Sequence, residues 1–310
     1  MKKPCFRIIM LGIIAAVLLC ASAFSAFAEE ETVYSVNEWN YVDGAIDITG
    51  GIPDDAEGVL AGIRERGVLR VATDPYFAPQ EFIDPEQEGQ ARYAGADMEL
   101  ARLIAERMGV RLEIVEMDFQ DVLTSVNLDE CDLAISALAF MPSRAVTNAM
   151  SKGYYFSDTP KTVMLIRQED ADSITALEGL KGKTLIAQQG SLQEAMVAGC
   201  EEVPVYLEFR RVPTIGEVYE ALRNGRADAG ALDAETAEAY LNKNPGCGLV
   251  IAEGIEFELQ AEYRGDRVAA KKGEYQLLYF VNGVIDEALA SGWYEQWIQE
   301  ARERAGELGL

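Results

Sequence analysis

Residues 95–117 are GADMELARLIAERMGVRLEIVEM. The first part predicts a helix from Asp97 to Met108, because its apolar positions recur at helical spacing and an Asp can cap its start. Gly109 suits the left-handed conformation that commonly ends a helix. The residues from Arg111 to Met117 then predict a strand. A helix that leads directly into a strand is one unit of an α/β fold.

The same alternation extends along the chain in both directions. The predicted strands are 68–72, 111–117, 132–136, 184–187, 205–209, 227–232 and 267–271. The predicted helices are 97–108, 120–128, one starting at 142, 191–198, 214–224, 234–241, 274–290 and 293–305. The pattern starts afresh near residue 184, so we predict an α/β fold of two lobes, each a mostly parallel sheet flanked by helices. Residues 66–160 plus 260–310 are assigned to lobe 1 and 161–259 to lobe 2, with ligands expected at the carboxyl ends of the strands.

The first 28 residues have the order of a secretory signal peptide, in which three basic residues precede an apolar run that ends in small residues. We predict cleavage after Ala28, which places the protein in the periplasm or at the extracellular face of the cytoplasmic membrane. An uncut membrane anchor and lipid attachment at Cys20 are the alternatives. Residues 29–65 are predicted to form an acidic N-terminal extension, packed loosely on the fold or serving as a stalk.

The composition excludes several classes of function. The formal net charge is −25, or −28 without the three basic residues of the leader, which opposes binding to nucleic acid. The chain has no histidine, which excludes a Ser-His-Asp site and any metal site built on imidazole. Cys131, Cys200 and Cys247 lack metal-ligand spacing, and a Cys200–Cys247 disulfide is left open. We expect no metal and no cofactor.

Several short motifs occur in a fixed order between about residues 66 and 300. They include LRVATD at 69–74, GADMELA at 95–101, DLAISA at 132–137, SR at 143–144, QGS at 189–191 and GRADA at 225–229. Together they resemble the bacterial extracellular solute-binding proteins of family 3, which bind polar amino acids for ABC transporters. The resemblance implies a two-lobed clamshell of the periplasmic-binding-protein type. Such a protein closes on a free amino acid as a monomer and presents it to a membrane permease.

A free amino acid carries a carboxylate and an ammonium on adjacent atoms, and the predicted site must match both. Arg144 can hold the carboxylate with a planar fork of N–H donors. Ser136, Ala137 and Ala139 lie at the carboxyl end of the strand 132–136. Their backbone groups are expected to complete the carboxylate and ammonium shells.

The second lobe is expected to add groups from two turns. Gly190, Ser191 and Leu192 stand before a predicted helix, where free N–H groups can point at a carboxylate. By resemblance, Asp233 accepts the ligand ammonium, with Glu235 as the neighbouring alternative. Ser191 and Asp233 can also be helix N-caps, a role that is compatible with ligand contact.

Aromatic and acidic residues are predicted around the ligand's side chain. By resemblance, Phe77 stacks on it, and Tyr76 is the alternative if the loop shifts by one residue. Asp74 can touch the side chain from the end of the first strand, and Phe119 can wall the same pocket. The sequence does not name the amino acid.

The main prediction is a solute-binding protein without catalytic residues. Two other functions stay open. A periplasmic enzyme on the same scaffold, resembling cyclohexadienyl or arogenate dehydratase, would need a poised general acid, for which Glu81 or Glu235 could serve. A solute sensor would need a separate signalling partner. For the binding protein, the chain crossings near residues 156–164 and 257–266 are expected to form the hinge.

Overall fold

The computed structural model describes residues 41–157, 161–200, 203, 205–258 and 264–310. The predicted signal peptide, residues 29–40 of the predicted extension and the central parts of both predicted hinge crossings lie outside the described residues. In the structure, the name lobe 1 refers to residues 41–157 together with 264–310, and the name lobe 2 refers to the described residues between 161 and 258.

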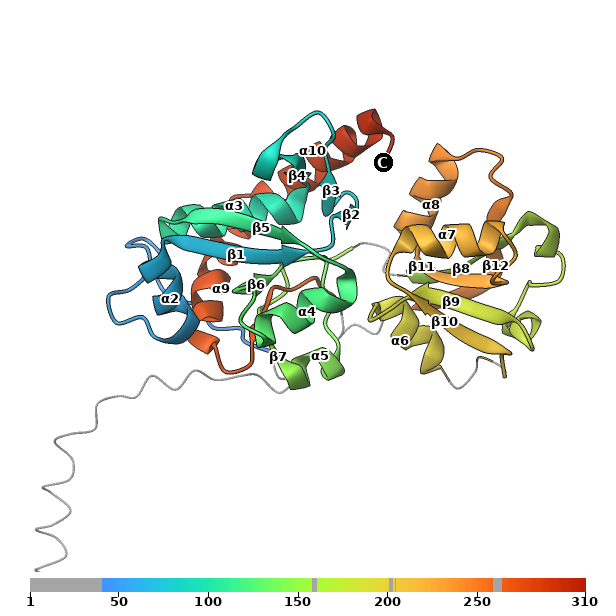
Figure 1. The fold of residues 1–310 in the computed structure, drawn as a ribbon, viewed down its shortest axis with the longest axis horizontal. Helices are drawn as coiled ribbons and strands as arrows, with labels where there is room; N and C mark the ends of the chain where they lie inside the picture. The colour runs from blue at the N-terminus through green and yellow to red at the C-terminus, as the bar shows by residue number, and fades with distance from the viewer. Residues whose placement is uncertain (1–40, 158–160, 201–202, 204, 259–263) are drawn as a thin grey trace, which may run out of the picture. The chain divides into compact units, whose positions relative to one another are not determined.

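Lobe 1 is organised by a five-stranded sheet (Figure 1). Its strands, in the order β5-β1-β6-β13-β7, are β5 (Arg111–Glu116), β1 (Val68–Thr73), β6 (Leu133–Ala134), β13 (Ala269–Lys271) and β7 (Asn148–Met150). β1 pairs in parallel with β5 and β6, whereas β13 is antiparallel to β6 and β7. A small antiparallel sheet of β2 (Tyr76–Phe77), β3 (Glu81–Ile83) and β4 (Tyr93–Ala94) follows β1.

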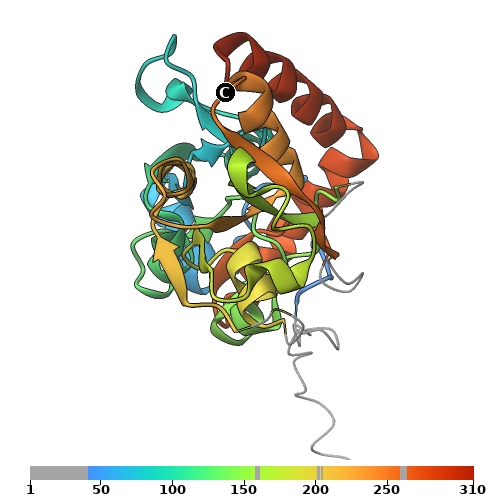
Figure 2. The ribbon, with the colours of Figure 1, turned by 90° about the vertical axis from the view of Figure 1, so that its right-hand side faces the viewer.

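Helices cover both faces of this sheet, as alternate side chains of β1 show. Leu69 and Val71 pack into a core with α2 (Gly58–Arg66), α3 (Ala96–Met108), α9 (Tyr275–Ala290) and α10 (Trp293–Leu308). Ala72 faces the other way, toward α4 (Phe119–Asn127) and α5 (Pro142–Thr147). The C-terminal helix α10 lies against α3 and α9, which returns the end of the chain to lobe 1. Figure 2 shows this helix in red, ending at the C-terminus at the top of the view.

Lobe 2 repeats this plan with a second five-stranded sheet. Its strands, in the order β10-β9-β11-β8-β12, are β10 (Glu208–Val212), β9 (Thr184–Gln188), β11 (Ala229–Asp233), β8 (Lys161–Arg167) and β12 (Leu249–Glu258). α6 (Leu192–Ala198) packs on one face, and α7 (Ile215–Arg223) and α8 (Ala234–Lys243) on the other. Both sheets are therefore mixed, because β8 and β12, like β13 and β7, pair antiparallel.

Several elements differ from the sequence prediction. The strand predicted at 205–209 is β10 at Glu208–Val212, and Val205 and Leu207 are 84% and 76% exposed. The helix that starts at Pro142 ends at Thr147, where β7 begins. Asp97 does not cap α3, since the N-cap is Gly95 and the Asp97 side chain turns toward other partners described below.

The described part of the predicted extension packs closely rather than loosely. Val42, Leu60 and Ile63 are fully buried in the lobe 1 core. The Val42 N–H donates to the Met150 carbonyl at 2.8 Å, and the Asn282 amide donates to the carbonyl of Val42. Residues 42–66 are thus part of lobe 1, because their apolar side chains cover apolar residues of α9 that would otherwise be exposed to solvent.

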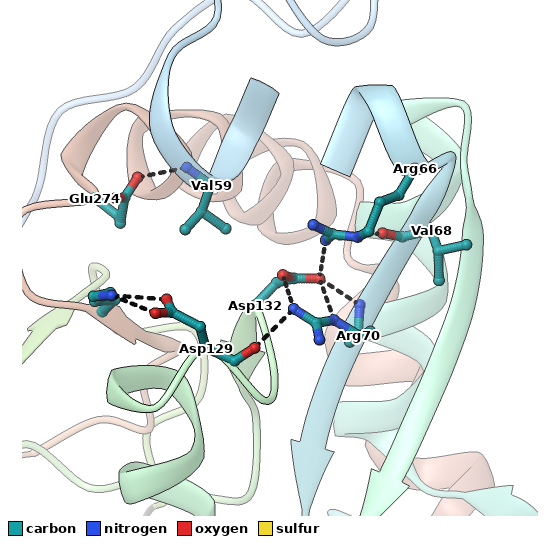
Figure 3. A network of polar contacts seen from close by, with 8 residues as sticks. Val59, Arg66, Val68, Arg70, Asp129, Asp132 and Glu274 are labelled. Atoms are coloured by element: carbon teal, nitrogen blue, oxygen red, sulfur yellow. Dashed lines mark hydrogen bonds and ion pairs between the residues drawn. The ribbon is translucent and has the colours of Figure 1, made fainter. Parts of the chain in front are cut away.

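A polar network fixes the end of α2 on the sheet (Figure 3). The Asp132 carboxylate accepts hydrogen bonds from Arg66 at 2.7 Å and from the Arg70 backbone and guanidinium at 2.8 and 3.0 Å. Glu274 accepts the Val59 N–H at 2.9 Å in the same region. These bonds tie α2, the start of β1 and the start of β6 together, at the strand ends opposite those that carry the site.

The three cysteines of the described residues are free thiols, and Cys200 and Cys247 pack on opposite faces of the lobe 2 sheet. Among the described residues, no helix combines the length and apolar character needed to cross a membrane.

Candidate functional site

A cavity of about 130 Å³ lies between residues of both lobes, at the carboxyl ends of the strands. Asp74 follows β1 and Ser136 follows β6, while Gln188 and Asp233 end β9 and β11. Parallel strands end at one edge of a sheet, so each sheet presents polar groups to the same space.

The structure gathers the predicted site residues around this cavity. Its lining includes the predicted residues Asp74, Tyr76, Phe77, Phe119, Ser136, Ala137, Ala139, Arg144, Ser191, Leu192 and Asp233. Gly190 is the exception, and it reaches the site through its carbonyl, which accepts a hydrogen bond from Arg144. Residues from four strand ends and from the first turns of α4, α5 and α6 therefore meet in one place.

Arg144 is buried and only partly satisfied. It is 4% exposed, and its Nη1 and Nη2 donate to the carbonyls of Ala139 and Gly190 at 2.7 and 2.9 Å. Its Nε is buried without an acceptor, and the guanidinium carbon lies 5.5 Å from the centre of the Phe119 ring. Burial lowers the pKa of Arg144 to about 10, so the side chain stays cationic at neutral pH. A buried cation with a spare donor is suited to an anionic partner.

Asp233 both caps a helix and lines the cavity. Its Oδ1 accepts the N–H groups of Glu235 and Thr236 at 2.9 and 3.2 Å, which is N-cap geometry for α8. Burial raises the pKa of Asp233 to about 6. The carboxylate is thus fixed in direction by the cap and is short of positive partners.

The turn before α6 is more fully occupied than predicted. Ser191 caps the helix by accepting the Glu194 N–H at 3.0 Å, and Glu194 accepts the Gly190 N–H at 2.7 Å. The Ser191 N–H donates to the Gln188 carbonyl at 3.3 Å. The N–H groups of Gly190 and Ser191 are therefore not free for a ligand. Helix geometry leaves those of Leu192 and Gln193 without intrahelical acceptors.

Ser136 and Ala137 are also held by protein groups. The Ser136 hydroxyl donates to Glu81 at 2.9 Å and accepts the Asp74 N–H at 3.1 Å. The Ala137 N–H donates to Asp97 at 2.8 Å, and Ala137 has a φ of 45°. The Ala137 N–H therefore already has an acceptor within the protein.

A hydrogen bond between lobes lies beside the Asp74 carboxylate. Gln188 Nε2 donates to Asp74 Oδ2 at 2.8 Å and to the Pro213 carbonyl at 3.0 Å. Burial raises the pKa of Asp74 to about 6. Gln188 was missed from the sequence, although extending the predicted strand by one residue would have placed it at the strand end.

The chain crossings add lining residues that the sequence did not reveal. Tyr155 and Asp266 pair through their backbones and both line the cavity. Burial, followed by the nearby carboxylates of Asp97 and Asp233, holds the pKa of Asp266 well above its usual range. Asp266 is the last residue of the predicted crossing at 257–266, and that position is the only sequence signal that could have pointed to it.

The cavity contains more acids than bases. Its acidic residues are Asp74, Glu81, Asp233, Glu235 and Asp266, against Arg144 and Arg264. Glu235 is paired with Arg302 of α10 at 3.1 Å, so the predicted alternative to Asp233 is engaged by the protein. No cluster of three or more potential metal ligands occurs among the described residues. The site can therefore hold a small organic molecule that carries both charges.

Known proteins are similar to this chain in both sequence and fold. The sequence pattern of the bacterial extracellular solute-binding proteins, family 3, matches residues 69–301. The arginine-binding extracellular protein ArtP of Bacillus subtilis (strain 168) is 29% identical over 206 residues, which cover 66% of this chain and 74% of ArtP.

Two solved structures share both lobes. The arginine-bound substrate-binding protein AbpA of an amino acid ABC transporter from Streptococcus pneumoniae is 30% identical, with a TM-score of 0.67 over 79% of this chain and 98% of AbpA. The ancestral amino acid-binding protein AncCDT-1, a precursor of cyclohexadienyl dehydratase, is 26% identical, with a TM-score of 0.64 over 78% and 99% of the two chains. With its family pattern spanning both lobes and the cavity between them, this chain belongs to the bacterial extracellular solute-binding proteins, family 3.

Proposed function

We propose that this protein captures a free amino acid outside the cytoplasmic membrane and hands it to the permease of an ABC importer. One observation carries the proposal: Arg144 of lobe 1 and Asp233 of lobe 2 line the same cavity. A guanidinium and a carboxylate on opposite walls match the two ends of one zwitterion. Because a buried charge is costly unless it is paired, a ligand with both charges is preferred over one with a single charge.

The anchoring roles follow from the donors that the protein leaves unused. Arg144 would hold the ligand carboxylate through Nε and the remaining N–H groups of its fork. The first-turn N–H groups of Leu192 and Gln193 would add donors from lobe 2. Asp233, fixed by its helix cap, would take the ammonium.

The rest of the cavity favours a cationic side chain on the ligand. Asp74 and Asp266 supply carboxyl groups beyond the one needed for the ammonium. Phe77 and Phe119 supply flat rings on which a guanidinium can stack. Arginine is the first candidate, and the arginine-binding relatives support it.

Transport would proceed by closure of the two lobes on the ligand. The ligand would meet the lobe 1 groups first, and closure would add Ser191, Leu192 and Asp233. The protein would act as an exported monomer that leaves its ligand unchanged, and the crossings near 156–164 and 257–266 would bend. Export rests on the predicted leader, and the extracellular and periplasmic relatives agree with it.

Isothermal titration calorimetry with arginine, after a thermal-shift screen of the common amino acids, tests the proposal. Arg144→Ala should lower affinity at least about 30-fold, because losing one partner of a buried charge pair costs roughly 2–5 kcal/mol. Asp233→Asn should weaken binding in the same direction while keeping the cap. Arg223→Ala, on an exposed face of α7, is the control and should bind like the wild type. Unchanged affinity in Arg144→Ala, or no amino acid bound by the wild type, would refute the proposal.

One observation favours an enzyme as the second candidate. Glu81 is a buried acid in the cavity wall, and burial and the nearby Asp97 carboxylate hold its pKa well above the usual range. The likeness to a precursor of cyclohexadienyl dehydratase adds to it. Incubation with prephenate or arogenate, followed by absorbance, tests this candidate. Turnover that Glu81→Gln abolishes would establish the enzyme, and no product would remove it.

A further inference from the structure

Two acids are buried against each other beneath the cavity wall. Glu81 of β3 is 1% exposed and Asp97 of α3 is 0% exposed. Their elements meet at Gly95, whose φ is 115° and where any Cβ would collide with the backbone of Gln80 and Glu81. The Asp97 N–H donates to the Gln80 carbonyl at 2.9 Å, which fixes the approach. Neither acid has been given a role in holding a ligand.

Asp97 is an acceptor for three separate parts of lobe 1. Its Oδ2 accepts the Ala137 N–H and the Tyr154 hydroxyl, both at 2.8 Å. Its Oδ1 accepts the hydroxyl of Tyr294, on α10, at 2.7 Å. A carboxyl group that accepts three donors is favoured in the ionised form, because each donated hydrogen bond stabilises the negative charge.

Glu81 has a different set of partners. Its Oε1 accepts the Ser136 hydroxyl, and that hydroxyl accepts the Asp74 N–H. Its Oε2 is buried and receives no donor. Glu81 and Asp97 are held close together, because the Asp97 N–H bonds the residue before Glu81 and their donors Ser136 and Ala137 are consecutive. Two buried negative charges this close would repel each other, and an ionised Glu81 would leave Oε2 without a donor. A proton on Glu81 Oε2 relieves both costs.

We propose that Glu81 and Asp97 share one proton, with Glu81 the neutral donor and Asp97 the ionised acceptor, and that the pair positions Asp74, Ser136 and Ala137 around the ligand. Burial, then the Asp97 charge, raises the pKa of Glu81 well above its usual range. Burial also raises the pKa of Asp97, and the hydrogen bonds from Ala137, Tyr294 and Tyr154 act to lower it.

Among the described residues, no cation hydrogen-bonds to either acid. The titratable groups that act on the pair there are Asp74, Tyr154, Tyr294 and Asp266, and none of them is a base. A second negative charge would push Glu81 and Asp97 apart, because both carboxyl groups are buried. Ser136 and Ala137 would then lose their acceptors, and Ala137 would lose the bond that holds its left-handed conformation.

Infrared difference spectroscopy at pH 7.5 tests the shared proton directly, on the ligand-free full chain. The spectrum of wild type minus Glu81→Gln should contain the C=O band of a protonated carboxylic acid. Ionised carboxylate bands in its place would overturn the proposal. This measurement needs no ligand, so its result is independent of the proposed function.

The positioning role is tested by arginine titration of two variants matched in size, and this arm rests on the proposed function. Glu81→Gln can still accept from Ser136 and donate to Asp97, so its affinity should stay within about threefold of the wild type. Glu81→Met fills the same space without polar groups, and its affinity should fall at least tenfold.

Equal affinities for the Gln and Met variants would overturn the positioning role, because side-chain volume alone would then explain Glu81. So would a tenfold loss in Glu81→Gln when thermal unfolding shows it folded. If the wild type binds no amino acid, the proposed function fails, while the infrared result still decides whether the proton is shared.

Discussion

At the scale of single residues, Asp233 is both the N-cap of α8 and a lining residue of the cavity. Its carboxylate caps α8 and faces the cavity, and burial raises its pKa from 3.8 to about 6. A raised acid pKa means that the folded protein holds the proton more tightly than the unfolded chain. The ionised carboxylate therefore lowers the stability of the ligand-free protein above about pH 6, and the effect disappears below about pH 4.

Asp233→Asn should therefore stabilise the ligand-free protein at pH 7.5 by about 1–3 kcal/mol, because a shift of one pKa unit corresponds to 1.36 kcal/mol and Asn caps helices as well as Asp. Urea unfolding between pH 4 and 8 measures this difference, which should grow between pH 4 and 6. A gain of the same size at pH 4 would contradict the explanation by charge.

Asp74 and Asp233 share this pKa of about 6 but differ in what holds them. The Asp74 carboxylate accepts a hydrogen bond from Gln188 of the other lobe. The Asp233 carboxylate instead accepts hydrogen bonds from the first N–H groups of its own helix, α8. The sequence could place both at strand ends. Their neighbours lie more than a hundred residues away in one case and two residues away in the other, so only the second could be foreseen.

At the scale of elements, the contact between β3 and α3 sets the position of the buried acid pair. Gly95 has a φ of 115°, a value that L side chains rarely adopt, and its α-carbon lies against the Gln80 carbonyl. Gly95→Ala should lower the free energy of unfolding by more than about 2 kcal/mol, since backbone strain and overpacking each cost roughly 1–3 kcal/mol.

Gly216→Ala in α7 is the matched control for this substitution. A Cβ at Gly216 would meet only the Thr214 hydroxyl, at 3.8 Å, and the residue lies in an ordinary helix. Ala should therefore be neutral or should stabilise by roughly 0.5–1 kcal/mol. Thermal unfolding of both variants checks the pair, and equal effects would mean that the close approach at Gly95 does not matter.

Amphipathic elements were the easiest to predict at this scale. The predicted helix at 97–108 and strand at 111–117 agree with α3 and β5 to within one residue at each end. The strand predicted at 205–209 lies at Glu208–Val212 instead. The prediction relied on the apolar residues Val205 and Leu207, which are exposed in the structure. β8 and β12 pair with each other across some eighty residues of sequence, and nothing local indicates that pairing.

At the scale of the whole molecule, few polar contacts join the two lobes beside the cavity. Gln188 donates to Asp74, Arg144 donates to the Gly190 carbonyl, and Arg302 pairs with Glu235. Each of these bonds exists only when the lobes are together. They bias the protein toward closure, so part of the free energy of closing comes from the protein itself.

Gln188→Ala should therefore weaken arginine binding by at least about tenfold, because a hydrogen bond to a charged group contributes roughly 1.5–3 kcal/mol. Calorimetry measures the affinity, and small-angle scattering of the ligand-free protein should report a larger radius of gyration. Gln189→Ala, whose side chain is exposed, is the control and should match the wild type in both. A wild-type affinity in Gln188→Ala would mean that this bond does not favour closure.

The sequence by itself determined most helices and the parallel strands, the family, and the choice of Arg144 and Asp233 as candidate anchors. Those features are local, since the spacing of apolar residues encodes which face is buried, and strand ends are where α/β ligands bind. Only the tertiary structure decided that Glu81 and Asp97 occupy the donors of Ser136 and Ala137, and that residues 42–66 complete the lobe 1 core. A buried polar group takes whichever partner folding brings to it from far along the chain, and spacing in the sequence does not record that choice.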